Sequence, residues 1–140
     1  MSKNISVELK NDVIEIGRMS QIVDEFCKAN NLTQDTLFAL NLSIEEILTN
    51  IISYGYDDND EHIILVRLYM NQGQVNIEVE DDGKPFNPLE VEPPDIHKPL
   101  DERPIGGLGI HLVKNHMDSL QYKRKEERNL LIMKKTANPD

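Results

Sequence analysis

The sequence contains a single cysteine and lacks long hydrophobic runs. Because Cys27 is alone among the 140 residues, it cannot form an internal disulfide, which fits a reducing compartment. No apolar run approaches the roughly 20 residues that span a membrane. The first residues also lack the basic and apolar regions of a secretory signal. We therefore expect a cytoplasmic protein without a membrane partner.

Positive charge is also scarce, with 15 Lys and Arg against 25 Asp and Glu and a formal net charge of −10. The basic clusters are residues 123–125 and 134–135, on expected terminal strands. Direct binding to nucleic acid is not expected, because it requires a clustered basic surface. A basic protein partner is compatible with this charge. A phosphate ligand would need backbone N–H groups and a metal ion to supply positive charge.

The length predicts one domain, residues 1–140, with 39% hydrophobic and 29% charged residues, as in ordinary globular chains. Alternating apolar residues predict strands at 5–9, 62–70, 75–79, 122–125 and 130–134. Apolar residues at three- and four-residue steps predict helices over residues 13–29, from Thr33 to about Tyr54, and over 110–117.

Helix boundaries carry their own signals. Asp12 and Glu15 have the spacing of a capping box for the first helix, whose apolar stripe begins at Val13. Asn30 and Asn31 should end this first helix, because asparagine tolerates a left-handed backbone. Thr33 should cap the next helix, and Gly55 should end that helix.

The second helix combines an apolar stripe with two polar residues. Glu46 and Asn50 are four residues apart, so they share a face one turn apart. A carboxylate and an amide in this arrangement can hold a water, a Mg²⁺ ion or both, since Mg²⁺ takes few protein oxygens beside substrate phosphates. Taken alone, the pair is better interpreted as ordinary polar positions on a solvated helix face, because such helix pairs are common.

Asp81 lies at the end of an expected strand and is followed by Gly83 and Pro85. A carboxylate there can accept a hydrogen bond from an exocyclic amine such as that of adenine, and Gly83 leaves room for a flat ring. The alternative is a turn Asp that binds its own backbone. The acidic residues 57–61 lack the spacing of a calcium loop and are expected to form a solvated turn.

A proline-rich segment, residues 85–104, precedes the glycines at 106, 107 and 109, which lead directly into a helix. A loop of this length in a compact domain is uncommon unless it is a functional lid or disordered. A glycine-rich helix start suits phosphate, because free N–H groups and the helix dipole face the ligand. A plain flexible turn remains the alternative.

In this order, the three motifs resemble the GHKL ATPase superfamily (gyrase, Hsp90, histidine kinase and MutL), and within it the anti-sigma-factor serine kinases. Residues 46–50 match Glu-x-x-Thr-Asn, and residues 81–86 match Asp-x-Gly-x-Pro-Phe. Residues 107–118 match Gly-x-Gly followed by an apolar helix and Met-Asp. The resemblance covers about residues 5–135.

The resemblance implies a role for each matching residue. Asn50 would bind a Mg²⁺ ion that bridges the nucleotide phosphates, and Glu46 would polarise the attacking hydroxyl or accept its proton. Asp81 would bind the adenine amine, with Gly83 beside the ring and Pro85 in the same motif.

Gly107 and Gly109 would shape the phosphate end of an ATP lid, residues 87–106, and Leu108 and Ile110 would offer backbone N–H groups. Arg103 is a candidate for a basic lid residue that meets the terminal phosphate, although its spacing to the glycines is not the usual one of the family.

Two positions depart from the family pattern. Relatives often carry His where Tyr54 stands, and many carry a Gly-Thr or Gly-Asn pair where Arg128 and Asn129 stand. Asn129 remains a candidate for a position near the adenine base.

The resemblance implies an α+β fold of the Bergerat type, a two-layer sandwich with a mixed, mostly antiparallel sheet and about three helices on one face. It implies an ATP- and Mg²⁺-dependent serine/threonine protein kinase that phosphorylates an anti-sigma-factor antagonist and sequesters a sigma factor. It also implies a homodimer. The alternatives are a nucleotide-binding regulatory module without useful kinase activity, and a detached catalytic domain of a histidine kinase.

Overall fold

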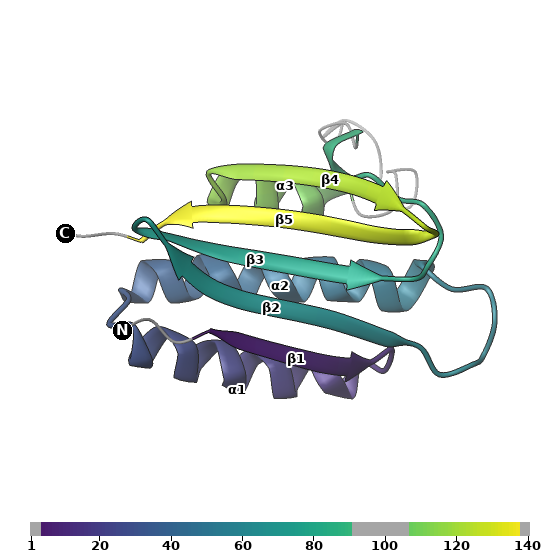
Figure 1. The fold of residues 1–140 in the computed structure, drawn as a ribbon, viewed down its shortest axis with the longest axis horizontal. Coiled ribbons are helices and arrows are strands. Elements are labelled where there is room, and N and C mark those ends of the chain that lie inside the picture. The colour runs from purple at the N-terminus through teal and green to yellow at the C-terminus, as the bar shows by residue number, and fades with distance from the viewer. Residues whose placement is uncertain (1–3, 91–106, 138–140) are drawn as a thin grey trace.

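The computed structural model describes residues 4–90 and 107–137. Within these residues, five strands form one sheet in the order β1-β2-β3-β5-β4 (Figure 1). The strands are β1 (Ile5–Lys10), β2 (Ile63–Asn71), β3 (Gln74–Asp81), β4 (Ser119–Lys125) and β5 (Arg128–Thr136). All four pairings are antiparallel, so the parallel pair implied by a mixed sheet does not occur in the described chain.

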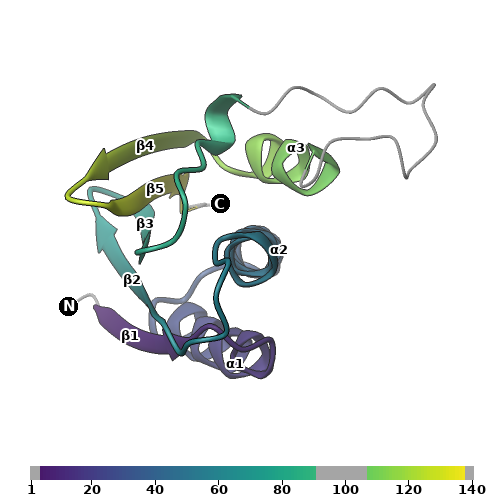
Figure 2. The same ribbon diagram turned by 90° about the vertical axis from the view of Figure 1, so that its right-hand side faces the viewer.

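The helices α1 (Ile14–Ala29), α2 (Gln34–Tyr54) and α3 (Gly107–His116) lie on one face of the sheet (Figure 2). The other face is left open, which confirms the expected two-layer α+β architecture. A short 3₁₀ helix, η1 (Pro88–Glu90), follows β3. In the part of the chain that is described, no helix is both long and apolar enough to cross a membrane.

The core lies between the two layers. Alternate strand residues point toward the helices and are buried, as the period of two requires; on β2 and β3 they are Ile64, Val66, Leu68, Val75, Ile77 and Val79. The stripe on α2 meets them in one cluster through Leu40, Ile44, Ile47 and Leu48. The apolar face of α2 is therefore buried in the core, and the neighbouring face of the helix is available for other contacts.

The start of α1 differs from the expected capping box. The helix begins one residue later, after Val13, which is 62% exposed and makes no side-chain cap. Asp12 accepts a hydrogen bond from the Ile14 N–H at 3.1 Å, and the Glu15 carboxylate reaches back to the Lys10 N–H at 2.9 Å. The capping box was wrong because Glu15 binds the end of β1 rather than the backbone of Asp12.

The boundaries of α2 follow the sequence more closely. The Thr33 hydroxyl accepts a hydrogen bond from the Thr36 N–H at 3.2 Å, as an N-cap residue should. Asn31, just before, has a positive φ of 55°. Gly55 ends the helix without a left-handed backbone; instead, a Cβ there would lie 2.5 Å from the Ile51 carbonyl oxygen. Glycine is required at this position by close contact with the preceding turn.

Candidate nucleotide site

A cavity of about 400 Å³ opens between α2, the end of β3 and the β4–β5 hairpin. Its wall is mainly apolar, with a few polar groups, as is usual for small-molecule sites. The polar or charged residues around it include Asn50, Asp81, Lys84 and Asn129. Pro85 also lines it, so residues from two of the three sequence motifs meet at one cavity.

Asp81 ends β3 with its carboxylate at the cavity, and the residue is only 4% exposed. Its Oδ1 atom accepts hydrogen bonds from the Gly83 N–H at 2.8 Å and from Asn129 Nδ2 at 3.0 Å. Burial raises the pKa of Asp81 above its usual value, and these two hydrogen bonds oppose the rise. Within the described residues no group donates to Oδ2, so this oxygen is left to accept a ligand hydrogen bond.

At Gly83 the chain turns away from β3 and passes very close to the backbone of Gly55. A Cβ at this position would lie 2.7 Å from the Gly55 carbonyl oxygen. That same oxygen accepts a hydrogen bond from the Lys84 N–H at 2.8 Å. The glycine therefore allows the turn at 81–83 to pack against the end of α2 beside the cavity.

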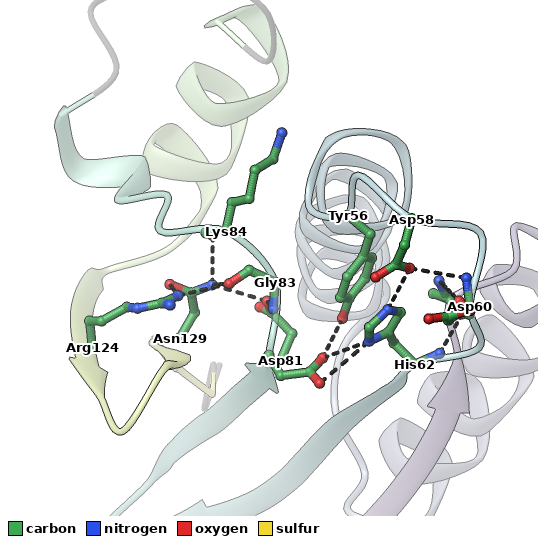
Figure 3. A network of polar contacts seen from close by, with 11 residues as sticks. Tyr56, Asp58, Asp60, His62, Asp81, Gly83, Lys84, Arg124 and Asn129 are labelled. Atoms are coloured by element: carbon green, nitrogen blue, oxygen red, sulfur yellow. Dashed lines mark hydrogen bonds and ion pairs between the residues drawn. The ribbon is translucent and has the colours of Figure 1, made fainter.

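Asn129, on β5 and paired with Asp81 across the sheet, is 6% exposed and forms a hub of hydrogen bonds (Figure 3). Its Nδ2 donates to Asp81 and, at 2.9 Å, to the Lys84 carbonyl oxygen. Its Oδ1 accepts from the Tyr122 hydroxyl at 2.5 Å and from Arg124 Nη1 at 3.0 Å. These bonds orient the amide and hold the Asp81 carboxylate in place.

Tyr122 and Arg124 were not among the sequence-based candidates. Arg124 also donates to the Gly83 carbonyl oxygen at 2.8 Å, so it braces the turn that follows Asp81. Arg124 pairs with Asn129 in the register of β4 and β5. The signal that would have found it is the register of the closing hairpin, which the sequence pattern alone does not specify.

Glu46 lies on α2 next to the start of α3. A Cβ on Gly109 would collide with the Glu46 carboxylate, so the first helical turn of α3 packs directly on this side chain. Burial, and then the charge of Glu45, raise the pKa of Glu46. The structure thus joins the first and third motifs by direct contact.

Asn50 lines the cavity one turn further along α2, and its Nδ2 atom is buried with no hydrogen-bond partner from the described protein. Since the two ends of an amide are assigned from their partners, either the oxygen or the nitrogen of Asn50 can face a ligand. An unpaired amide at a cavity wall fits one protein oxygen for Mg²⁺. Among the described residues no group of three or more His, Cys, Asp or Glu could hold a metal ion.

The remaining expected residues are spread more widely. Gly107 begins α3, and Ile110 is fully buried in the core, so only its backbone is available to a ligand. Arg103 and the side chain of Leu108 lie outside the described residues.

Of the expected lid, residues 87–90 are described. Asn87 accepts a hydrogen bond from the Leu89 N–H at 2.9 Å as η1 begins. Tyr54, where relatives often carry His, lines the cavity and is 49% exposed.

Fold and site together define a class: an α+β domain that sets a buried Asp at a strand end and an Asn on a neighbouring helix at one cavity of about 400 Å³. A Glu on that helix lies against the glycine at the start of another helix. The sequence also matches the model of the histidine kinase-like ATPase domain over residues 9–135, and the chain belongs to this family of ATP-binding domains.

Similar proteins agree with this assignment. The chain is 30% identical over 119 residues to the anti-sigma F factor of Clostridium perfringens (strain ATCC 13124), covering 83% of this chain and 84% of the relative. It is 27% identical to the serine/threonine-protein kinase BtrW of Bordetella bronchiseptica, covering 74% and 72%. It is 33% identical to the serine-protein kinase RsbW of Bacillus mycoides, covering 71% and 64%.

The fold resembles the crystal structure of the RsbU and RsbW domains of Rv1364c from Mycobacterium tuberculosis, with a TM-score of 0.70. Sequence identity there is 10%, over 96% of this chain and 32% of that one. It also resembles a histidine kinase domain from Erythrobacter litoralis, with a TM-score of 0.58, 16% identity, and coverage of 89% and 60%. At these identities the likeness concerns the fold alone.

Proposed function

We propose that this protein is an ATP-dependent protein serine/threonine kinase that also acts as an anti-sigma factor. The observation that carries the proposal is the contact between Glu46 and the start of α3, on the same helix that brings Asn50 to the cavity. This contact supports the role of general base for Glu46, because the carboxylate lies beside a glycine-rich helix N-terminus. The position of Asp81 at the cavity supports its role as the acceptor for adenine. The names of the relatives support the same activity.

The residues divide the work of binding and transfer. Asp81 accepts a hydrogen bond from the adenine amine, and the braced turn at 81–83 flanks the ring. Asn50 holds a Mg²⁺ ion, which when bound offsets the charge of the phosphates. Glu46 accepts the proton of the attacking serine hydroxyl, and its raised pKa makes it a stronger base than an ordinary glutamate. Gly109 lets the N–H groups at the start of α3 approach the phosphates.

The proposed protein substrate is a serine on an anti-sigma-factor antagonist, and the proposed sequestered partner is a sigma factor. If ATP and ADP favour different partners, each partner must favour a different nucleotide in turn, because such coupling is reciprocal. We propose a cytoplasmic location, a role in transcription regulation, and a homodimer, in keeping with the family. The acidic net charge of −10 favours a partner with a basic docking surface.

The test is transfer of labelled phosphate from ATP to a matching antagonist by the Glu46→Gln variant. We expect ATP binding to stay within about threefold of wild type, while transfer falls by about 100-fold or more, because only the base is lost. Glu25→Gln is the control for the same chemical change, since Glu25 is exposed on α1, and it should retain transfer. Unchanged transfer by Glu46→Gln would exclude the assigned base.

The second candidate function is a nucleotide-binding regulatory module that binds protein partners without useful catalysis. Tyr54 at the cavity, in place of the His of many relatives, favours it. The same labelling experiment separates the two functions, because a pure binding module would bind ATP and leave every antagonist unlabelled.

A further inference from the structure

The loop from α2 to β2, residues 55–62, carries a polar cluster centred on His62 (Figure 3). The ring of Tyr56 stacks on the imidazole, with centroids 4.0 Å apart and planes inclined by 15°. The backbone N–H of His62 donates to the Asn11 side chain at 2.9 Å. The imidazole is therefore held in one place by stacking and by its own backbone.

Both ring nitrogens of His62 face carboxylates. Nε2 lies 2.8 Å from Asp58 Oδ1, and Nδ1 lies 3.3 and 3.4 Å from the two carboxylate oxygens of Asp82. A neutral imidazole has a single N–H, whereas the imidazolium has two. Only the protonated ring can donate to Asp58 and Asp82 together, so this arrangement selects the charged form.

The surrounding charges favour the same form. The hydrogen bond to Asp58 is the main cause that raises the pKa of His62, against some burial. Tyr56 donates to Asp82 at 3.1 Å and stays neutral, since burial above all raises its pKa. Glu61, which precedes His62, forms an ion pair with Lys10 at 3.6 Å. Among the described residues, Asp58 and Asp82 are thus the charges that face the imidazole.

Asp82 connects this cluster to the nucleotide cavity, because it lies between Asp81 and Gly83. The loop and the turn at 81–83 are also joined by the Lys84 N–H to the Gly55 carbonyl oxygen, and by Lys84 Nζ to Asp57 at 2.9 Å. Figure 3 shows His62 on one side of Asp81 and Gly83, with Asn129 and Arg124 on the other. Among the side chains in these contacts, His62 has the unperturbed pKa that lies nearest to neutral pH, and its partners raise that pKa.

We propose that His62 is a positioning residue for the nucleotide: as the imidazolium it binds Asp82 and holds the turn at 81–83 in the geometry that receives adenine. The inference rests on the proposed nucleotide site and adds a residue that does not touch the ligand. Since the charged form makes the contact, nucleotide affinity is highest below the pKa of His62 and falls as pH rises through it. By linkage, nucleotide binding raises the pKa of His62 in turn.

The experiment is calorimetric titration with Mg²⁺-ADP from about pH 5.5 to 9, in the range where histidine titrates. The wild-type Kd should rise by about threefold or more across the range, since half a pKa unit of linkage corresponds to that factor. His62→Gln should bind ADP more weakly at low pH, and its Kd should lack this rise with pH. His116→Gln, whose ring lies against Phe38 instead, should keep the wild-type profile. Titration of the ADP phosphates is common to all variants.

A milder variant covers the case in which His62→Gln does not fold. Asp58 is exposed and does not line the cavity. Because its hydrogen bond is the main cause that raises the pKa of His62, Asp58→Asn should lower that pKa and move the midpoint to lower pH, with unchanged affinity below it. NMR titration of the His62 ring should show a higher pKa with ADP than without. Equal midpoints in wild type and Asp58→Asn, or equal ring pKa values with and without ADP, would overturn the inference alone. Absence of ADP binding at every pH would overturn the proposed nucleotide site as well.

Discussion

At the scale of single residues, the site depends on which oxygen of a carboxylate is occupied. Gly83 and Asn129 both bind Oδ1 of Asp81, so the protein saturates one oxygen and leaves the other to a ligand. The cost of burying this charge is visible in its raised pKa. A buried carboxylate with one free oxygen is a specific acceptor for an amine, because an unpaired partner there would be costly.

We expect Asp81→Asn to weaken ADP binding by about 10- to 150-fold, the range for a hydrogen bond to a charged group. Asparagine offers less negative charge to the adenine amine and disturbs the bond from Asn129. Isothermal calorimetry measures the change, with Asp24→Asn on α1 as a control that should bind normally. Wild-type affinity in Asp81→Asn would remove adenine from this end of the cavity.

A second prediction at the scale of single residues concerns Gly109. Because a Cβ would collide with the Glu46 carboxylate, Gly109→Ala should displace the base and lower kcat for phosphate transfer by about 10- to 100-fold. ADP binding should change less, since Gly109 lies against Glu46 and the proposed acceptor for adenine is Asp81 on β3. Gly17→Ala is the matched control, because a Cβ there meets nothing within 4 Å on α1. A Gly109→Ala enzyme with normal kcat would mean that the start of α3 moves away from Glu46 during transfer.

At the scale of elements, α2 does two jobs. Its buried stripe belongs to the core, while Asn50, Ile51 and Tyr54 near its C-terminal end line the cavity. The position of the site residues is therefore set by the packing of the whole helix. The helix in turn depends on its ends, at Thr33 and Gly55.

We expect Thr33→Ala to lower the free energy of unfolding by about 0.5–2 kcal/mol, because the Thr36 N–H loses its cap. Thr33→Ser keeps the oxygen and should lose much less. Urea unfolding followed by circular dichroism measures both. Equal stability of the two variants would show that the cap contributes little to α2.

At the scale of the whole molecule, the open face of the sheet carries a network of charges. Arg67 on β2 binds Glu78 at 2.8 Å and Glu80 at 3.2 Å, and Arg128 binds Glu80 at 2.6 Å. The Tyr69 hydroxyl donates to Glu78 at 2.6 Å. These contacts link three neighbouring strands, and they occupy the face that the helices do not cover.

The network predicts a loss of stability in acid. Burial opposes the ionisation of Glu78, but the hydrogen bonds from Tyr69 and Arg67 outweigh it and lower its pKa. The hydrogen bond from Arg128 is the main cause that lowers the pKa of Glu80. Groups with a lowered pKa stabilise the fold above their ordinary pKa, and this contribution is lost as pH falls through the lowered value.

Unfolding by urea between about pH 7 and 3 should therefore show stability falling below the ordinary Glu pKa of about 4.3. The fall should be smaller in Glu78→Gln than in Glu25→Gln, a variant of an exposed carboxylate on α1. Identical pH profiles for these two variants would mean that the network makes no net contribution.

Much of the fold is already present in local patterns. The period of two in β2 and β3, and the stripe on α2, predict the elements because side-chain direction repeats with the backbone. The caps at Thr33 and Asn31 are likewise local, since their partners lie within a few residues. The capping box at Asp12 failed because the side chain of Glu15 had a competing partner, the end of β1.

For the site, the sequence alone determined the chemistry: a carboxylate at a strand end, a Glu and an Asn one helical turn apart, and glycines where a helix starts. The tertiary structure decided which of these groups meet. In the folded chain Asn129 binds Oδ1 of Asp81, and Gly109 contacts Glu46. Arg124 donates a hydrogen bond to the Gly83 carbonyl oxygen. His62 lies between two carboxylates. The reason is physical: sequence periodicity reports the face a residue occupies, whereas strand register and helix packing set the distances between faces.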